Sequence, residues 1–329
     1  MKPFHAKREN SEFSKQVKLA YRHRMTHAAR LLSTPTVATL AVALTAVLFG
    51  LVPLFARPLL EEGVSPAGIA LYRYVFSAAL LIPFLPLAPG KRREGLLIGG
   101  AGGAMGLGLV GYLEAIETAP IAAAGVIYMS YPLFCVAFAW WLLGQRPTGR
   151  AVTAGAMILA AAALLLDHGA LGADAVWALL WSVPAPMTFG LIVVVLCAMT
   201  PSLAPLEKMA AGMTGATLGL TPIAFGMEAR SALPQSAEGW ALIAALGLTT
   251  AFLPQLLYTV AATRVGAARA SAAGSFELPT MLAIGWLVFG ETLGPRGLFA
   301  SALVLAAIAL SPAIRPQAPV PRAVEKELA

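Results

Sequence analysis

Charged side chains are scarce in this sequence. Only 12% of its 329 residues are Asp, Glu, Lys or Arg, whereas 58% are hydrophobic. Soluble domains carry roughly 25% charged and 45–50% apolar residues. Because so few charges cannot keep a chain of this length in water, the composition indicates a membrane protein. No polar stretch is long enough to form a separate soluble enzyme domain.

Cysteine and histidine are also rare, with two and four copies. Cys135 and Cys197 lie far apart in apolar runs, so we expect buried, unpaired thiols rather than a disulfide framework. Three histidines fall within the first 34 residues and His168 in a loop, without the spacing of a metal site. No nucleotide-binding motif is present. The sequence therefore predicts no metal, no cofactor and no use of nucleotide hydrolysis.

Long apolar runs fill most of the chain instead. Each is near the roughly 20 residues that cross a hydrocarbon core about 30 Å thick. The sequence therefore predicts an all-α, polytopic membrane protein of ten transmembrane helices. The expected segments are 36–56, 66–87, 95–116, 119–143, 148–166, 174–198, 204–226, 238–262, 267–289 and 295–313.

The basic residues orient this bundle. Ten spans place both termini on one side of the membrane, and 19 of the 23 Lys and Arg residues fall on that side. The positive-inside rule makes this side cytoplasmic, which predicts the inner membrane of a bacterium. The net charge of +7 then follows from topology. No nucleic-acid partner is expected, because no aromatic platform or binding motif accompanies the charge.

Residues 1–34 form a basic leader with eight Lys or Arg residues and no apolar core of a secretory signal peptide. Phe13, Val17 and Tyr21 recur at near-helical spacing, which fits an amphipathic helix on the inner membrane surface. A disordered tail that only enforces orientation fits equally well, and translation could also begin at Met25. Residues 314–329 form a second cytoplasmic tail.

One stretch occurs twice. Residues 112–166 align without a gap on residues from 258 onward at an offset of 146 positions. The informative matches are Tyr112 with Tyr258, Trp140 with Trp286, Gly144 with Gly290 and Arg150 with Arg296. This indicates an internal duplication into five-helix repeats, residues 35–167 and 168–313. Because five is odd, the second repeat must enter the membrane in the opposite sense, and such inverted repeats are typical of alternating-access transporters.

These motifs resemble the drug/metabolite transporter superfamily of the EamA type. The matching residues are Tyr112-x-x-Ala115 with Gly144-Gln145, Tyr258-x-x-Ala261 with Gly290-Glu291, and Leu71-Tyr72-Arg73-Tyr74. The resemblance covers about residues 36–313 and implies a ten-span secondary transporter. Gln145 departs from the acid usual in the first turn, and Phe49 stands before Gly50 where many members carry Trp.

Three ionisable residues within the expected spans are candidates by their position, Arg73, Glu114 and Glu277, because such groups inside a membrane usually face the bundle interior. Glu277 is the deepest. It either joins helices or lines a transport cavity, where it would pair with an amine or carry a coupling proton. Arg73 either is structural, paired with Glu114 or Glu117, or holds a substrate carboxylate at a gate.

Prolines and polar side chains at mid-span extend the candidate cavity. Prolines at matched levels of two repeats mark binding sites in broken helices, although they could also merely kink helices for packing. The further candidates are Phe49, Tyr128, Tyr131, Pro132, Trp181, Gln255, Tyr258, Ser275 and Pro279. The repeat alignment places Tyr131 opposite Glu277 across the pseudo-two-fold axis.

Three functions remain open. The first is a secondary exporter of small metabolites such as amino acids, purines or amphipathic drugs, embedded in the lipid bilayer and driven by a solute or proton gradient. The second is an importer of a charged or cofactor-like metabolite on the same fold. The third is a membrane-embedded enzyme, although no paired nucleophile and base or metal site is evident.

The topology predicts which face each loop occupies. A cysteine in His168→Cys should react with an impermeant thiol reagent added outside intact cells, because position 168 follows the fifth expected span. A cysteine in Arg92→Cys should react only after the membrane is opened. The opposite labelling pattern would show that the protein has the reverse orientation in the membrane.

Overall fold

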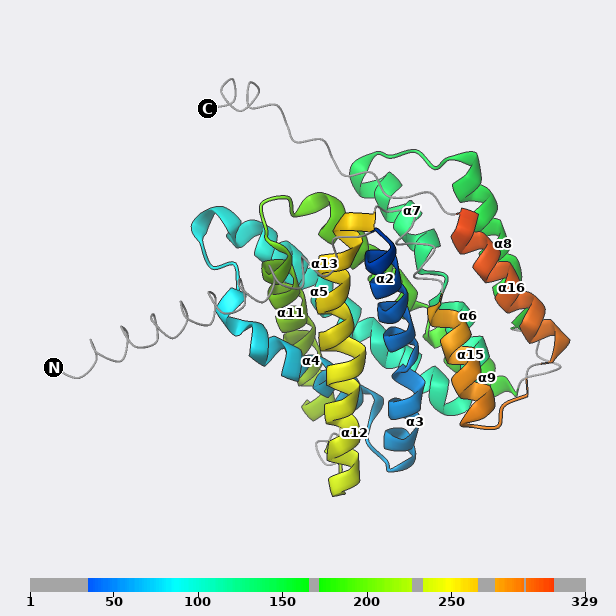
Figure 1. The fold of residues 1–329 in the computed structure, drawn as a ribbon. Coiled ribbons are helices and arrows are strands. Elements are labelled where there is room, and N and C mark those ends of the chain that lie inside the picture. Colours follow the sequence, from blue (N-terminus) through cyan, green and yellow to red (C-terminus); the bar gives the residue numbers. More distant parts are fainter. Residues whose placement is uncertain (1–34, 166–171, 227–232, 266–275, 293, 311–329) are drawn as a thin grey trace.

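A computed structural model describes residues 35–165, 172–226, 233–265, 276–292 and 294–310. All regular secondary structure in these ranges is helical (Figure 1). The predictions for the leader, His168, Ser275 and the C-terminal tail lie outside the described residues.

The helices of the first half follow the predicted segments, with different ends. They are α2 (Pro35–Gly50), α3 (Val52–Glu61), α4 (Pro66–Leu81), η1 (Ile82–Phe84), α5 (Pro89–Thr118), α6 (Ile121–Tyr128), α7 (Tyr131–Leu143) and α8 (Gly149–Leu165). The first apolar segment thus runs on to Glu61. Helix α5 begins six residues before the expected position 95, and its 30 residues exceed the roughly 20 that a bilayer requires.

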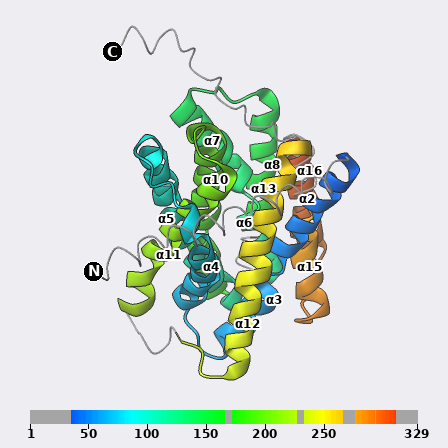
Figure 2. The same cartoon turned by 60° about the vertical axis from the view of Figure 1, so that its left-hand side comes forward.

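The second half contains the remaining described helices. They are α9 (Ala173–Trp181), α10 (Pro184–Val194), η2 (Val195–Met199), α11 (Pro205–Gly226), α12 (Ala237–Gly247), η3 (Leu248–Phe252), α13 (Leu253–Val265), α15 (Glu277–Leu287) and α16 (Pro295–Leu310). The short elements η2 and η3 are π-helical and continue neighbouring α-helices. In Figure 2, α12 and α13 form one long rod that passes α2.

Six helical segments are long and apolar enough to cross a membrane, counted over the ranges given above. They are 36–61, 66–84, 89–118, 121–143, 173–199 and 237–258. Helices α8 and α16 are apolar but shorter, and they pack side by side at one edge of the bundle (Figure 1). A multi-pass membrane protein is therefore supported, while the count of ten spans stays a prediction.

Several apolar segments are broken rather than continuous. The fourth expected segment divides at Met129–Ser130, and Pro132 occupies the second position of α7. Pro53 and Pro184 similarly stand at the start of α3 and α10. Proline lacks an N–H and fits best in the first turn of a helix, although α3 and α11 each also contain an interior proline, which membrane helices tolerate. The first-turn prolines mark the starts of α3, α7 and α10.

The two repeats have matching local structure. Helices α7 and α15 begin at residues 131 and 277, and α8 and α16 begin at 149 and 295, which preserves the offset of 146. Gly144 and Gly290 have φ of 66° and 65°. In both turns the residue after the glycine donates a backbone hydrogen bond to the preceding helix. Gln145 N donates to Ala139 O at 3.2 Å, and Glu291 N donates to Gly285 O at 2.8 Å. Glycine is favoured in this left-handed cap. The inverted orientation of the repeats stays a prediction.

Glycines bring α5 against α11. A Cβ placed on Gly102 would overlap the carbonyl oxygen of Gly212, and one on Gly215 would overlap that of Gly99. Further along α5, Gly108 and Gly111 meet the backbone of Pro184 and Trp181. Close approach of this kind drives helix association where lipid removes the hydrophobic effect between helices. The glycine run therefore serves packing.

Gly102→Ala should destabilise the fold, because overpacking at a backbone contact costs about 1–3 kcal/mol. The thermal midpoint of the purified protein in detergent should fall. Gly100→Ala is the matched control on the same helix, since its Cβ would meet nothing within 4 Å. An equal fall in both variants would attribute the effect to α5 itself rather than to its contact with α11.

Candidate functional site

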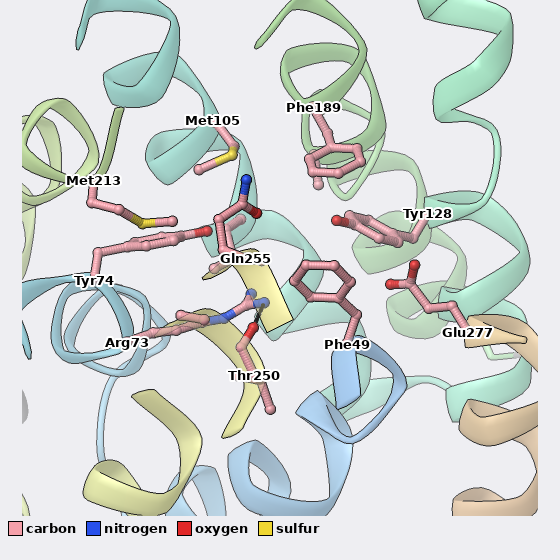
Figure 3. Close-up of a pocket in the computed structure, with 13 residues that line it drawn as sticks. Phe49, Arg73, Tyr74, Met105, Tyr128, Phe189, Met213, Thr250, Gln255 and Glu277 are labelled. Atoms are coloured by element: carbon pink, nitrogen blue, oxygen red, sulfur yellow. Dashed lines mark hydrogen bonds between the residues drawn. The ribbon is translucent and has the colours of Figure 1, made fainter. Parts of the chain in front are cut away.

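A cavity of about 40 Å³ lies at the centre of the bundle, between the two halves of the chain (Figure 3). Nine helical elements contribute to its wall. The lining residues are Phe49, Arg73, Tyr74, Met105, Leu109, Tyr128, Ala185, Phe189, Met213, Thr250, Ala251, Gln255 and Glu277. The volume holds roughly three water molecules. A larger solute therefore requires lining side chains to move.

Glu277 is the first residue of α15 and is 8% exposed. Its carboxylate points into the cavity, and it forms no hydrogen bond or ion pair with any residue that the structure describes. The positive end of the α15 dipole favours a negative charge at this position. The dipole alone does not replace the hydration of a buried carboxylate, so burial of a charge at Glu277 carries a free-energy cost.

Arg73 reaches the cavity from the middle of α4 and is also 8% exposed. Its Nη2 donates to the carbonyl oxygen of Thr250 at 2.8 Å, and its guanidinium lies 5.6 Å from the Tyr74 ring centroid. Thr250 belongs to the π-helical element η3, and such segments recur at functional sites. The Nε atom of Arg73 is buried without a described hydrogen-bond partner.

The expected ion pair of Arg73 with Glu114 or Glu117 is not formed. Arg73 turns inward to Thr250, whereas Glu114 is partly exposed and Glu117 exposed near the end of α5. In the view of Figure 3, Arg73 and Glu277 approach the cavity from opposite sides with the Phe49 ring between them. The two charges are therefore not joined to each other by an ion pair.

Aromatic rings form the wall beside Glu277. Tyr128, the last residue of α6, has its ring centroid 5.0 Å from that of Tyr112 and 5.8 Å from that of Phe189. Tyr112 is 2% exposed and its hydroxyl lies 3.8 Å from Met281 Sδ. Tyr112, the tyrosine that matches Tyr258 in the repeat, thus packs behind Tyr128 and does not itself line the cavity.

Two ion pairs tie helix ends together away from the cavity. Arg57 Nη1 lies 2.7 Å from Glu291 Oε1, and Glu291 also accepts from the amide of Ile121. Lys91 Nζ lies 2.8 Å from Glu207 Oε2. Each pair joins the first half of the chain to the second.

The sequence matches the model of the EamA-like transporter family twice, over residues 36–167 and 176–311. The chain belongs to the EamA-like transporter family. A solved crystal structure whose title names no activity superimposes with a TM-score of 0.55, covering 84% of this chain and 96% of that chain at 19% identity. At this identity the likeness supports the fold alone. Among curated protein sequences, none matches this chain.

Family membership confirms the resemblance drawn from the paired motifs and indicates a transporter rather than an enzyme. The cavity of this EamA-like transporter contains five of the residues that the sequence singled out. They are Phe49, Arg73, Tyr128, Gln255 and Glu277.

Other candidate residues do not line the cavity. Trp181 is 62% exposed and Tyr258 is 36% exposed, while Pro279 is exposed in the first turn of α15. Tyr131 and Pro132 are partly buried at the start of α7, where the Tyr131 ring packs edge-on against Phe189 at 5.0 Å. Tyr128 ends α6 and lines the cavity together with Glu277, whereas Tyr131 lies past the break, at the start of α7, and does not line it.

Sequence reasoning missed most of the apolar lining. Met105, Leu109 and Met213 carry no signal in helices that are apolar on every side, whereas Tyr74 could have been found beside Arg73. Cys135 is buried as expected, but Cys197 is exposed in the π-helical element η2. Across the described ranges, no group of three His, Cys, Asp or Glu residues is placed to hold a metal ion.

Proposed function

We propose that this protein is a secondary exporter that moves small metabolites across the inner membrane of a bacterium by alternating access, with both termini in the cytoplasm. One observation carries the proposal: Glu277 and Arg73 are buried in one cavity between the two halves, without an ion pair to a described residue. Leaving ions unpaired in an apolar bundle is costly. A polar solute that enters the cavity offsets this cost.

Glu277 also provides a way to couple export to the inward proton gradient. A carboxylate oxygen that holds a proton cannot at the same time form an ion pair with the cationic group of a solute. Proton binding from the outside therefore releases solute, and proton loss to the cytoplasm frees the carboxylate for the next solute molecule. This competition drives solute outward as protons move inward, without nucleotide hydrolysis.

The lining favours solutes with an amine or a carboxylate on an apolar body, as in amino acids and amphipathic drugs. Purines stay among the solutes that the sequence predicts. Glu277 is placed to pair with a cationic amine, and Arg73 to bind a carboxylate in place of the Thr250 carbonyl. Met105, Met213 and Gln255 have flexible side chains that enlarge the cavity by changing rotamer.

Glu277→Gln should lower solute export several-fold and remove its dependence on external pH, because the amide neither binds a proton nor pairs with an amine. Flux from loaded proteoliposomes would be measured with a solute found by a resistance screen of overexpressing cells. Glu114→Gln is the matched control, since Glu114 is only partly buried and does not line the cavity. Wild-type flux and pH dependence in Glu277→Gln would remove this residue from the mechanism.

Arg73→Gln should weaken transport of carboxylate-bearing solutes by about tenfold or more, the loss typical of one charge-assisted hydrogen bond. Amines without a carboxylate should be much less affected. The two KM values would be compared in the same proteoliposomes, with Arg73→Lys expected to restore part of the loss. An equal loss for both solute types would assign Arg73 a structural role.

A further inference from the structure

Three segments far apart in the sequence meet at the carboxylate of Glu291, in the turn after α15. Arg57 of α3 donates to Oε1 at 2.7 Å, and the amide of Ile121, the first residue of α6, lies 2.9 Å from Oε2. The Arg57 guanidinium also lies 4.9 Å from the centroid of the Phe289 ring. One carboxylate therefore joins the end of the first apolar segment, the start of α6 and the end of α15.

The local packing is built around this carboxylate. The side chains of Arg57 and Glu291 are only 18% and 16% exposed, so the pair is largely shielded from solvent. A Cβ added at Gly285 would lie 2.9 Å from Glu291 Oε2 and 3.6 Å from the Cβ of Ile121. Gly285 thus leaves the space that the carboxylate occupies. Charge-assisted bonds in such shielded places are stronger than those on open surfaces.

The corresponding turn of the first repeat is built differently. At the offset of 146, Ala139 stands at the position of Gly285, and Gln145 at that of Glu291. The first turn therefore contains a methyl group where the second has space and an uncharged amide where the second has an acid. Only the second repeat provides a carboxylate at this turn.

Two short helices connect Glu291 to the cavity. Helix α6 runs from Ile121, at Glu291, to Tyr128 in the cavity wall, and α15 runs from Glu277 in the cavity to the turn containing Glu291. The helices pack on each other, and Leu278 lies in one buried cluster with Val126 and Met129. Together they form a wall between the cavity and this end of the bundle.

We propose that the Arg57–Glu291 ion pair is a latch that holds this wall shut, and that it must open for the cavity to reach this face of the membrane. The charge distribution predicts that this face is extracellular. The proposal extends the alternating-access function proposed above. The ion pair ties the turn after α15 to α3 at the end remote from the cavity, so its release frees this end of α15 to move away from α3.

The test measures access to the cavity and needs no solute. A cysteine in Gln255→Cys, introduced with Cys197→Ser, reports on the cavity lining. In intact cells, an impermeant thiol reagent should modify it roughly tenfold faster when Arg57→Gln or Glu291→Gln is added, because one charge-assisted hydrogen bond biases an equilibrium by about that factor. Arg57→Lys keeps the charge and should retain most of the slow rate.

Two comparisons make the result specific. Arg57→Gln leaves Glu291 able to accept from Ile121, so a rise in both variants identifies the ion pair rather than the helix cap as the latch. Lys91→Gln removes the other ion pair, with Glu207, and should not raise labelling in intact cells. Thermal midpoints in detergent identify variants that are merely unfolded.

Unchanged labelling in Arg57→Gln, with an unchanged thermal midpoint, would overturn the latch. An equal rise in Lys91→Gln would also overturn it, by showing general loosening. Faster labelling in a protein that shows no solute flux would support the latch and contradict the proposed export function. Solute flux with no change in labelling would support export and contradict the latch.

Discussion

The cost of removing an ion from water is the constraint on which the rest of this structure depends. In an apolar bundle, a charged group must find a protein partner, water or a solute. Arg57 with Glu291 and Lys91 with Glu207 meet this requirement by pairing at helix ends. Glu277 and Arg73 lie between these pairs in the central cavity and have no ion pair with a described residue. The paired charges join the two halves of the chain, while the central charges line the cavity between them.

Breaks in the helices lie where these central charges are needed. Helix α6 ends at Tyr128, α15 begins at Glu277, and the π-helical element η3 supplies the Thr250 carbonyl to Arg73. Irregular backbone inside a membrane protein is tolerated where it lines a cavity or is buried in protein. Prolines near the starts of half-helices produce some of these breaks. The same residues that interrupt the helices therefore help to determine where the cavity lies.

The sequence predicted the apolar helices and the family because composition, the offset of 146 and the matched pair Gly144 and Gly290 can all be read without knowing the fold. It also singled out Glu277 and Arg73, which both line the central cavity, since an ionisable residue in an apolar run is conspicuous. Trp181 and Tyr258, which it also singled out, do not line that cavity, because a helix that is apolar on every side does not reveal which of its faces is turned inward. The Arg57–Glu291 pair could not be foreseen, since 234 residues separate its members.

The difference between the two repeats explains why one short helix matters more than its counterpart. Helix α15 has only 11 residues and carries Glu277 at its start, while Glu291 lies in the turn four residues after its end at Leu287. The matching positions of the first repeat are Tyr131 and Gln145, neither of which is an acid. The 11 residues of α15 thus link the cavity to the turn that holds Glu291 through one short helix. The second repeat therefore supplies both the cavity carboxylate and the carboxylate of the turn after α15, whereas the first supplies Arg57 and Ile121, which bind Glu291, and Tyr128 of the cavity wall.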